Sequence, residues 1–394
     1  MPCNNFRFPR NALLDAVLRG QYAGKLMRAS SRKLVLVAVG LCIVGFILYR
    51  SRTLFHFGDF SGAKLLHAIR DANLPLLVLS VLAIYTCYGL RSLRWQVFQR
   101  NLGPSRFWTI YQATLAGFAS VFLLGRAGEP VRPMLLARNE KLPLSGMFGI
   151  YVLERVFDIA CTAVIAAIGL VLFRAHGGDS EGGRALTSAL GSSLFLGVLV
   201  AIAVLIYLRL HGTALLERRL QNVIAAHGWK AKAARIALGF ARGVQTIRTR
   251  GQLVLAVLYS AAHWFLVLLV YFWVLHSFGG PLRDLGLRDT MIVMAFTSLG
   301  SVVQLPGVGG GSQVLTVFAL TKIFDVPNEL AVVAAIVLWL TTFASCSLAG
   351  VPLLLHQGWS LGQLREMAKH EDEVIDTEIA GKQNASARRG ESPE

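Results

Sequence analysis

The sequence is poor in charged residues, and acidic side chains are the scarcer kind. Of 394 residues, 15% are charged and 54% are hydrophobic, with 22 acidic against 39 basic side chains. A soluble domain typically carries about 25% charged residues. Several windows reach roughly 17 residues without a charge, the length needed to cross a bilayer. This shortage excludes a soluble enzyme, a disordered protein and a fibrous repeat, and it predicts an all-α polytopic membrane protein.

The common sequence signatures of catalysis and metal binding are also missing. The five cysteines form no Cys-x-x-Cys pair, which argues against a disulfide framework and a zinc site. No Gly-x-Ser-x-Gly motif occurs, and no group of His, Cys, Asp and Glu has metal-ligand spacing. The glycines within 307–311 are not followed by Gly-Lys-Ser/Thr, so they do not form a P-loop. We predict no cofactor, no metal and no catalytic residue; enzymatic activity is left open but is not favoured.

The excess positive charge lies beside apolar segments. The net charge is +17, yet no zinc finger, RNA-binding signature or basic stripe interleaved with aromatics accompanies it, so nucleic acid is not a predicted partner. Basic loops stay in the cytoplasm and attract anionic lipid. The basic stretches 1–33, 91–106 and 209–250 are therefore predicted to be cytoplasmic. This places both termini on the cytoplasmic side of a multi-pass protein of the cell membrane.

The apolar segments organise the chain into one membrane domain. Residues 1–33 are predicted to form a basic cytoplasmic segment, residues 34–356 the transmembrane domain, and residues 357–394 a charged, disordered tail. The stretch Arg91-Ser-Leu-Arg94-Trp95 is typical of an anchor at the membrane surface. The six predicted full spans are 34–49, 74–90, 147–173, 189–208, 252–278 and 330–356.

Two further apolar segments are interrupted and cannot cross as ordinary helices. Residues 107–124 end in Gly-Arg-Ala-Gly-Glu-Pro-Val-Arg-Pro, and each charge at the bilayer centre costs at least about 2.5–3.5 kcal/mol. The apolar run 290–324 is broken by Pro306 and four glycines. With the basic loops inside, we predict two opposed re-entrant hairpins of broken helices. Such hairpins are typical of inverted-repeat transporters, whose site lies where the hairpins meet.

Charged residues in and beside the first hairpin form the candidate site. Arg126, Glu129 and Arg132 recur at intervals of three, which places them near one helix face. We interpret the set as a headgroup cavity in which Arg126 and Arg132 contact a phosphate. A structural ion-pair network that only fixes the hairpin is the alternative interpretation. The predicted substrate-binding residues are Arg126, Glu129, Arg132, Glu154, Arg155 and Asp158.

Glycine and proline are concentrated at the two predicted hairpin tips. Glycines let a ligand approach the backbone and can present N–H groups to an anion, and tight packing of the tip explains them equally well. His263, in the span 252–278, is expected to be a hydrogen-bonded core residue rather than a proton relay. The tip residues are Gly125, Gly128, Pro130, Pro306, Gly307, Gly309, Gly310, Gly311 and Gln313.

Several motifs together resemble one family of membrane proteins. Over about residues 34–356 the chain resembles the lysylphosphatidylglycerol synthase transmembrane (flippase-like) family. The resemblance rests on four stretches, which begin at Arg91, at Gly125, at Glu154 (Glu-Arg-Val-Phe-Asp) and at Leu305 (Leu-Pro-Gly-Val-Gly). The resemblance implies movement of a lipid across the membrane. The 38 residues after position 356 are too few for the soluble synthase domain of the name-giving members. Many relatives also have an acid where this chain has Gln313, so the lipid substrate is left open.

Three functions are compatible with these features. The first is a flippase-like transporter for a phospholipid or another lipid-linked headgroup, equilibrating or driven by a gradient because no ATP-binding motif is present. The second is a membrane-embedded enzyme of an aminoacyl or glycosyl lipid pathway, with Glu129, Glu154 or Asp158 as acid or base. The third is a non-transporting partner of a separately encoded soluble synthase. The predicted partners are membrane lipids, anionic or phosphate-containing, and the oligomeric state is not predicted.

Overall fold

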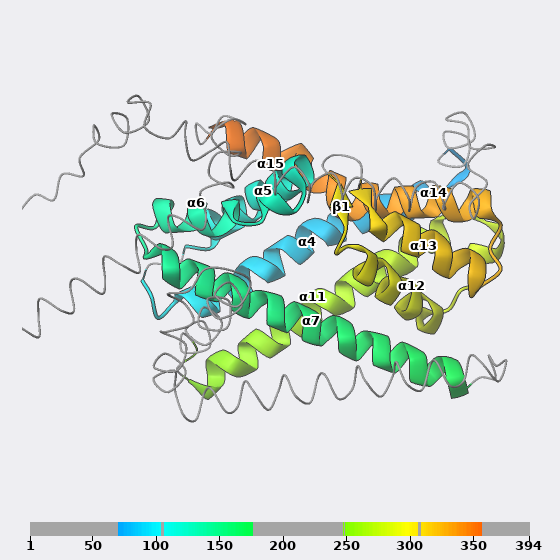
Figure 1. Ribbon diagram of the computed structural model, residues 1–394, viewed down its shortest axis with the longest axis horizontal. Helices are drawn as coiled ribbons and strands as arrows, with labels where there is room; N and C mark the ends of the chain where they lie inside the picture. The colour runs from blue at the N-terminus through cyan, green and yellow to red at the C-terminus, as the bar shows by residue number, and fades with distance from the viewer. Residues whose placement is uncertain (1–69, 104–105, 176–246, 248, 306–308, 357–394) are drawn as a thin grey trace, which may run out of the picture. The chain divides into compact units, whose positions relative to one another are not determined.

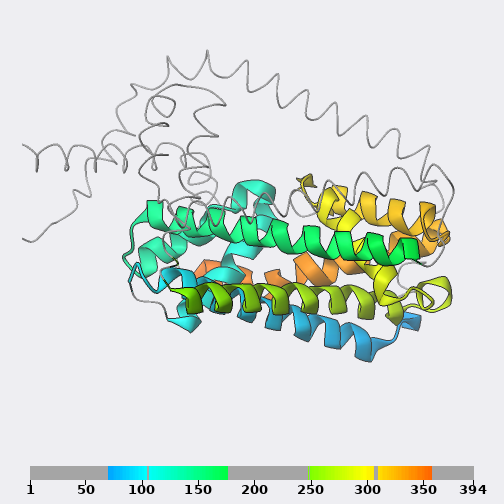
Figure 2. The same ribbon diagram turned by 90° about the horizontal axis from the view of Figure 1, so that it is seen from below.

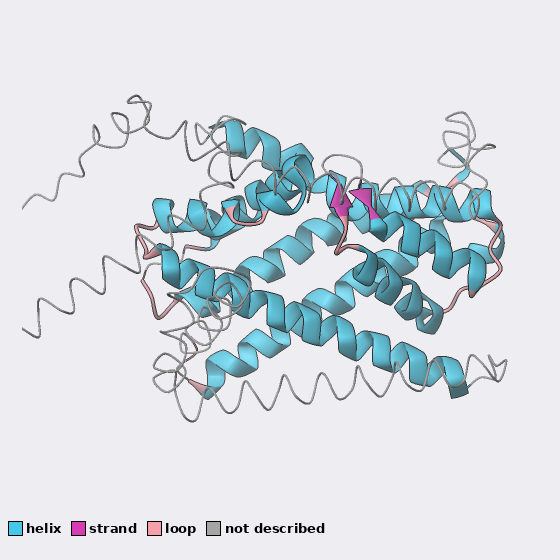
Figure 3. Cartoon of the chain, viewed as in Figure 1, coloured by secondary structure: helices cyan, strands magenta, loops and turns pink. Residues whose placement is uncertain are grey.

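The part of the chain that the structure describes is helical apart from one β-ladder of two-residue strands. The computed structural model describes residues 70–103, 106–175, 247, 249–305 and 309–356. The predicted spans 34–49 and 189–208, the terminal segments 1–33 and 357–394 and most of the basic stretch 209–250 lie outside the described residues. The elements are α4 (Leu74–Gln99), α5 (Phe107–Leu124), η2 (Gly125–Gly128), α6 (Val131–Asn139), α7 (Leu144–Ala175), α11 (Arg250–Ser277), η3 (Gly280–Leu282), α12 (Leu287–Gly300), β1 (Gln304–Leu305), β2 (Gly309–Gly310), α13 (Gly311–Lys322), α14 (Asn328–Trp339), η4 (Leu340–Ala344) and α15 (Ser345–His356) (Figures 1 and 3).

Long apolar helices make up most of the described part. Four of them coincide with predicted spans, and another is the apolar arm of the first predicted hairpin. The prediction of an all-α polytopic membrane protein is thereby confirmed. Helix α11 lies along α4 and also contacts α7 (Figure 2). Within the described residues, five segments are long and apolar enough to cross a membrane: Leu74–Gln99, Phe107–Gly128, Gly146–Leu172, Arg250–Ser277 and Asn328–Leu355.

Helix α4 continues past the end that the sequence predicted for its span. It begins after Asn73, whose side-chain oxygen accepts a hydrogen bond from the Leu76 N–H at 3.3 Å and so satisfies a donor of the first turn. Arg91, Arg94 and Trp95 lie within the helix and are only 6%, 1% and 0% exposed. The predicted membrane-surface anchor at these residues is wrong, because carboxylates of α7 pair with both arginines inside the helix bundle.

The first predicted hairpin is present as α5, the η2 turn and α6. Gly125 follows α5 with a φ of 64°, a left-handed conformation that favours glycine. Gly128 packs directly on the main chain of Ser120, so a Cβ at this position would collide with α5. Pro130 immediately precedes α6 with a φ of −66°, which suits the entry to a helix. These contacts turn the chain sharply back toward its own first arm.

The second predicted hairpin is present as α12, the β1–β2 turn and α13. Strand β1 pairs antiparallel with β2. Gly310 has a φ of 138°, which side chains rarely tolerate. Gly300 and Gly311 face each other so closely that a Cβ on either would collide with the main chain of the other. Glycine contacts therefore close this hairpin as they close the first one.

The two hairpins meet at their tips. The guanidinium group of Arg126 donates to the backbone carbonyl of Ser301 at 2.7 Å and to that of Val302 at 3.2 Å. In Figure 1 the turn after α5 and strand β1 lie near each other, and α6 and α13 extend from there in opposite directions. This is the meeting of opposed hairpins that the sequence predicted, whereas an inverted repeat stays a prediction.

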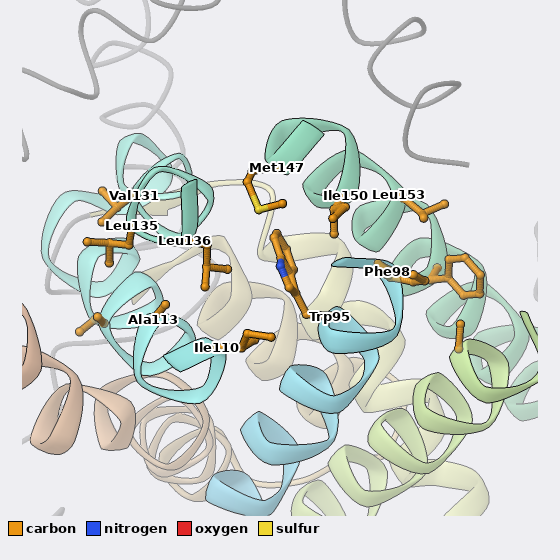
Figure 4. Close-up of a cluster of buried hydrophobic side chains, with 14 of the residues drawn as sticks. Trp95, Phe98, Ile110, Ala113, Val131, Leu135, Leu136, Met147, Ile150 and Leu153 are labelled. Carbon is orange, nitrogen blue, oxygen red and sulfur yellow. The ribbon is translucent and has the colours of Figure 1, made fainter. Parts of the chain in front are cut away.

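A hydrophobic core holds α6 against α4 and α7. Figure 4 shows Trp95 surrounded by Ile110, Leu136, Met147 and Ile150, all of them fully buried. Side chains packed at this density resist displacement, because each movement loses many dispersion contacts at once. The core therefore fixes the position of α6, and the arginine in the first turn of that helix is directed toward α7.

Candidate functional site

A fully buried carboxylate, that of Glu154 on α7, lies at the centre of a charged cluster. It accepts hydrogen bonds from Nη1 of Arg91 at 3.2 Å and from Nη2 of Arg94 at 3.0 Å, both on α4. Nη1 of Arg132 on α6 approaches its second oxygen at 2.9 Å. One carboxylate thus ties three arginines from two other helices together, and α7 is the element that positions them.

A second carboxylate, that of Asp158, lies one turn further along α7. The four-residue spacing puts it on the same face as Glu154. Its oxygens accept from Arg91 at 3.1 Å and from Arg94 at 2.8 Å. Arg155 pairs with it at 3.1 Å, and the indole N–H of Trp264 on α11 donates to it at 3.3 Å. The acidic pair that the sequence singled out is therefore brought together with four guanidinium groups.

Positive charge exceeds negative charge in this cluster. Among the described residues, its ion pairs join the guanidinium groups of Arg91, Arg94, Arg132 and Arg155 to two carboxylates, which leaves two positive charges in excess within this part of the chain. Uncompensated charge in a low-dielectric interior is costly. An anion placed against the cluster would offset the excess.

Arg132 has hydrogen-bonding capacity to spare. Its guanidinium group lies over the Trp95 ring at 4.2 Å from the ring centroid, an attractive cation–π contact. Its Nε and Nη2 atoms are buried and find no acceptor among the described residues. Gly117 of α5 makes room for the side chain, since a Cβ there would lie 2.5 Å from Cβ of Arg132. Two unpaired donors of one guanidinium group are the fork that binds two oxygens of a phosphate or carboxylate.

Arg126 differs from Arg132 in its contacts. Besides the two backbone carbonyls of the second hairpin, it pairs with Glu129 at 2.8 Å through Nη1. All three of its nitrogens are therefore engaged within the protein, although 46% of its side chain is exposed. The sequence predicted a phosphate contact here; the structure places Arg126 as a bridge between the hairpin tips.

The predicted row of charged side chains on one helix face, Arg126, Glu129 and Arg132, is only partly present. Arg126 and Glu129 form a pair, and the Tyr151 hydroxyl of α7 donates to the same carboxylate. Arg132 turns away from Glu129 and pairs with Glu154 instead. The three-residue spacing correctly indicated proximity, but the neighbouring helix α7 decides which charges pair.

A cavity of about 380 Å³ lies against these residues. Small-molecule sites are typically about 300–1,000 Å³. Part of its wall is the five-residue η4 turn between α14 and α15, a π-helix; such turns often occur at functional sites. The residues around it include charged side chains (Arg91, Arg126, Glu129, Arg132, Arg155, Asp158), apolar or aromatic ones (Ile84, Phe118, Val121, Ile159, Trp264, Val267, Val302, Phe343) and hydroxyl-bearing ones (Thr297, Ser298, Ser301, Thr342).

Packing accounts for the described glycines of the second hairpin. The Gly310 N–H donates to the side-chain oxygen of Gln313 at 2.6 Å, which caps the start of α13. Gly311 packs on Gly300, and Gly309 belongs to the short ladder. Pro306 and Gly307 lie outside the described residues. No anion-binding arrangement of N–H groups is therefore needed to explain the described part of this tip.

Sequence reasoning missed two arginines of the cluster, Arg91 and Arg94. Arg94 also donates to the Ser260 hydroxyl of α11 at 2.9 Å. A signal was present: two basic residues three apart at the end of one apolar helix match Glu154 and Asp158, four apart within another. Complementary charge pairs on two apolar helices indicate pairing inside the bundle rather than exposure at its surface.

These features define a class: a multi-pass, all-helical membrane protein in which two opposed hairpins meet beside a cavity lined by charged side chains. The model of one protein family, Lysylphosphatidylglycerol synthase TM region, matches residues 35–350. The chain belongs to this family, which confirms the resemblance seen in its motifs and places it among membrane proteins that associate with membrane lipids. No curated protein and no solved structure matches the chain.

Proposed function

We propose that the protein binds the phosphate-containing headgroup of a membrane lipid in the charged cavity and moves that lipid between the two leaflets. The observation that carries the proposal is the excess of two positive charges in the ion-pair cluster beside the cavity. A phosphate group brings one or two negative charges and would offset that excess. In this proposal both termini are cytoplasmic and the protein resides in the cell membrane.

A lipid is a better ligand for this cavity than a free anion. Ile159 and Val302 line the cavity and are also 67% and 64% exposed at the surface of the molecule. A wall that is charged inside and apolar toward its opening suits a molecule with a charged head and a hydrocarbon tail. The acyl chains would remain in the bilayer while the headgroup enters.

Arg132 is the residue that we expect to contact the phosphate. Its two unpaired N–H-bearing atoms match two phosphate oxygens, whereas each nitrogen of Arg126 already has an acceptor within the protein. Movement between leaflets requires the cavity to open alternately to each side, as hairpin-containing transporters do. The contacts of Arg126 with Ser301 and Val302 would break whenever the tips separate.

Reconstitution into liposomes tests the proposal. Fluorescently headgroup-labelled phosphatidylglycerol, an aminoacylated lipid and a polyprenyl phosphate are each incorporated, and a membrane-impermeant quencher reports the leaflet of the label. We expect the protein to accelerate exchange of at least one of them. Unchanged leaflet distribution for all three would contradict a transport function.

Arginine variants connect transport to the cavity. Arg132→Ala should abolish exchange, and Arg132→Lys should restore only part of it because lysine lacks the bidentate fork. Arg138→Ala changes an exposed arginine of the same helix and should leave exchange unchanged. Thermal stability in detergent is measured beside exchange, so that loss of folding is distinguished from loss of binding.

A lipid-modifying enzyme, the alternative function, would be detected by a different measurement, the masses of the membrane lipids. Its candidate acid or base groups, Glu154 and Asp158, are each engaged by three arginines, which leaves them little access to a substrate. An enzyme changes the mass of a lipid, whereas a flippase changes only its sidedness. Comparing the lipid masses of cells with and without the protein separates the two, and co-purification of a soluble transferase would support the role of synthase partner.

A further inference from the structure

His263 of α11 is held in one neutral tautomer by its two neighbours. Nη2 of Arg91 lies 3.1 Å from Nε2 of the ring, and the backbone carbonyl oxygen of Cys87 lies 3.2 Å from Nδ1. An arginine nitrogen only donates and a carbonyl oxygen only accepts. Nε2 therefore carries the lone pair and Nδ1 carries the proton. The ring is buried and lines the cavity beside the arginine cluster.

The groups that face this ring decide whether it can take a second proton. Arg91 and Arg94 of α4 present positive charge to it, and Asp158 of α7 presents negative charge. The Cys87 thiol points at the backbone carbonyl of His263 rather than at the ring. Helices α12 and α14 also pack on α11, and their charged residues, Arg288, Asp289 and Glu329, all lie in their first turns. Because positive charge is already in excess here, the ring stays neutral while the cavity holds no anion.

We propose that His263 takes up one proton when an anionic headgroup enters the cavity, so that lipid movement is coupled to a proton. The inference rests on the proposed headgroup binding. The proton comes from water in the cavity and binds to Nε2, and no other covalent bond changes. A protonated Nε2 no longer accepts a hydrogen bond from Arg91. Nη2 of Arg91 is then released toward the phosphate, while Nη1 keeps its contacts with Glu154 and Asp158.

The proton and the headgroup stabilise each other in this arrangement. The phosphate offsets the added positive charge, and coupling between two ligands is reciprocal. Raising the pH removes the proton and weakens headgroup binding. Where one full proton accompanies each headgroup, affinity falls about tenfold for each unit of pH. A proton gradient would thereby supply the driving force for which the sequence offers no ATP-binding motif.

Calorimetric titration of the full-length protein with dioctanoyl phosphatidylglycerol tests the coupling. Its phosphodiester does not titrate between about pH 5 and pH 8, the range in which histidine changes its charge. Titrations in two buffers of different ionisation enthalpy give the number of protons taken up per bound lipid. We expect a number approaching one, with an affinity that falls as the pH rises. Binding without proton uptake overturns the coupling and leaves the headgroup site intact. Failure to bind this lipid overturns the coupling as stated, and the liposome assay then decides separately on transport.

Two histidines of the same helix provide a matched pair of variants. His263→Gln keeps an oxygen that accepts from Arg91 but takes no proton, so lipid affinity should become independent of pH and proton uptake should vanish. His276 contacts the Phe272 carbonyl at 3.0 Å and is not a cavity residue, so His276→Gln should behave as the wild type does. Proton uptake that persists in His263→Gln overturns the assignment. If that variant does not fold, the wild-type titration still decides whether a proton is bound.

Discussion

The two hairpins share a backbone design and differ in chemistry. Each has a glycine at positive φ, Gly125 or Gly310, and each is closed by a glycine, Gly128 or Gly300, that touches the main chain of the opposite arm. The first hairpin carries three charged residues around its break, whereas residues 290–321 of the second contain no Asp, Glu, Lys or Arg. Glycine packing therefore builds the hairpins, and only one of them brings charge to the cavity.

This difference in charge predicts that the first hairpin forms a fixed wall of the cavity and the second hairpin a movable one. Arg132 ties the first hairpin to α7 through its 2.9 Å pair with Glu154, and separating a buried ion pair costs several kcal/mol. The second hairpin offers neutral groups to the cavity, among them the backbone carbonyls of Ser301 and Val302. Moving neutral groups past the cavity carries a small electrostatic cost. We expect the second hairpin to move and the first to stay.

Neutralising Glu154, which anchors the first hairpin to α7, should lower the stability of the protein more than the other changes below. Glu154→Gln takes the negative charge away from three arginines and raises the local positive excess. Breaking a buried ion-pair cluster in this way costs about 3–5 kcal/mol, so the melting temperature in detergent should fall sharply. Glu140→Gln, at the end of α6 and outside the cluster, is the control and should melt as the wild type does. Equal stability of the two variants would show that the cluster does not anchor the hairpin.

Adding a methyl group at the glycine contacts tests whether the two hairpins are built alike. Gly128→Ala and Gly300→Ala each place a Cβ against main-chain atoms, and overpacking of this kind costs about 1–3 kcal/mol. Gly251→Ala is the control, because no atom lies within 4 Å of the Cβ it would add. It should change stability by less than about 1 kcal/mol. If only one hairpin is sensitive, the shared design is refuted. Unfolding in detergent is the measurement for all three.

The apolar arms of the hairpins and the breaks between them could be predicted because both depend on residues that are close together in the sequence. Runs without charge predict helices of membrane length, and Gly125 or the glycines near Pro306 mark where such a run must turn. Hydropathy alone predicts that the second span ends at residue 90, because it treats every arginine as a residue of the membrane surface. Arg91 and Arg94 contradict that rule because their partners on α7 compensate them.

The pairing inside the site could not be predicted, because it depends on contacts across the fold. The sequence predicts Glu154 and Asp158 as site residues, yet their partners on α4 are at least 60 residues away in the sequence. The bridge from Arg126 reaches backbone carbonyls some 175 residues away, and a backbone carbonyl gives no sequence signal. The tautomer of His263 likewise follows only from the two groups that face its ring.

The smallest expected effect on stability, and the sharpest test of the comparison, is at the bridge between the tips. Arg126→Ala should cost on the order of 1 kcal/mol, because the side chain is 46% exposed and solvent screens its pair with Glu129. The tips should nevertheless part more often, since a loss of about 1 kcal/mol shifts the equilibrium between closed and open tips about fivefold. A cysteine introduced by Ser301→Cys reports this through its rate of labelling with an impermeant maleimide. We expect labelling to be about fivefold faster with Arg126→Ala than with Arg138→Ala in the same background.

Transport by the same Arg126→Ala protein decides between the two roles that can be assigned to this arginine. If Arg126 only bridges the hairpins, lipid exchange should change less than in Arg132→Ala, because the phosphate contact is intact and only the balance between closed and open tips is altered. Glu129→Gln should then resemble a weaker form of Arg126→Ala, since it loosens the arginine without removing the donors to Ser301 and Val302. A stable Arg126→Ala protein that labels at the control rate and has lost transport would assign the headgroup contact to Arg126 itself. In that case the charged hairpin would be the one that meets the lipid at its tip, and the neutral hairpin would contribute only the opposite wall.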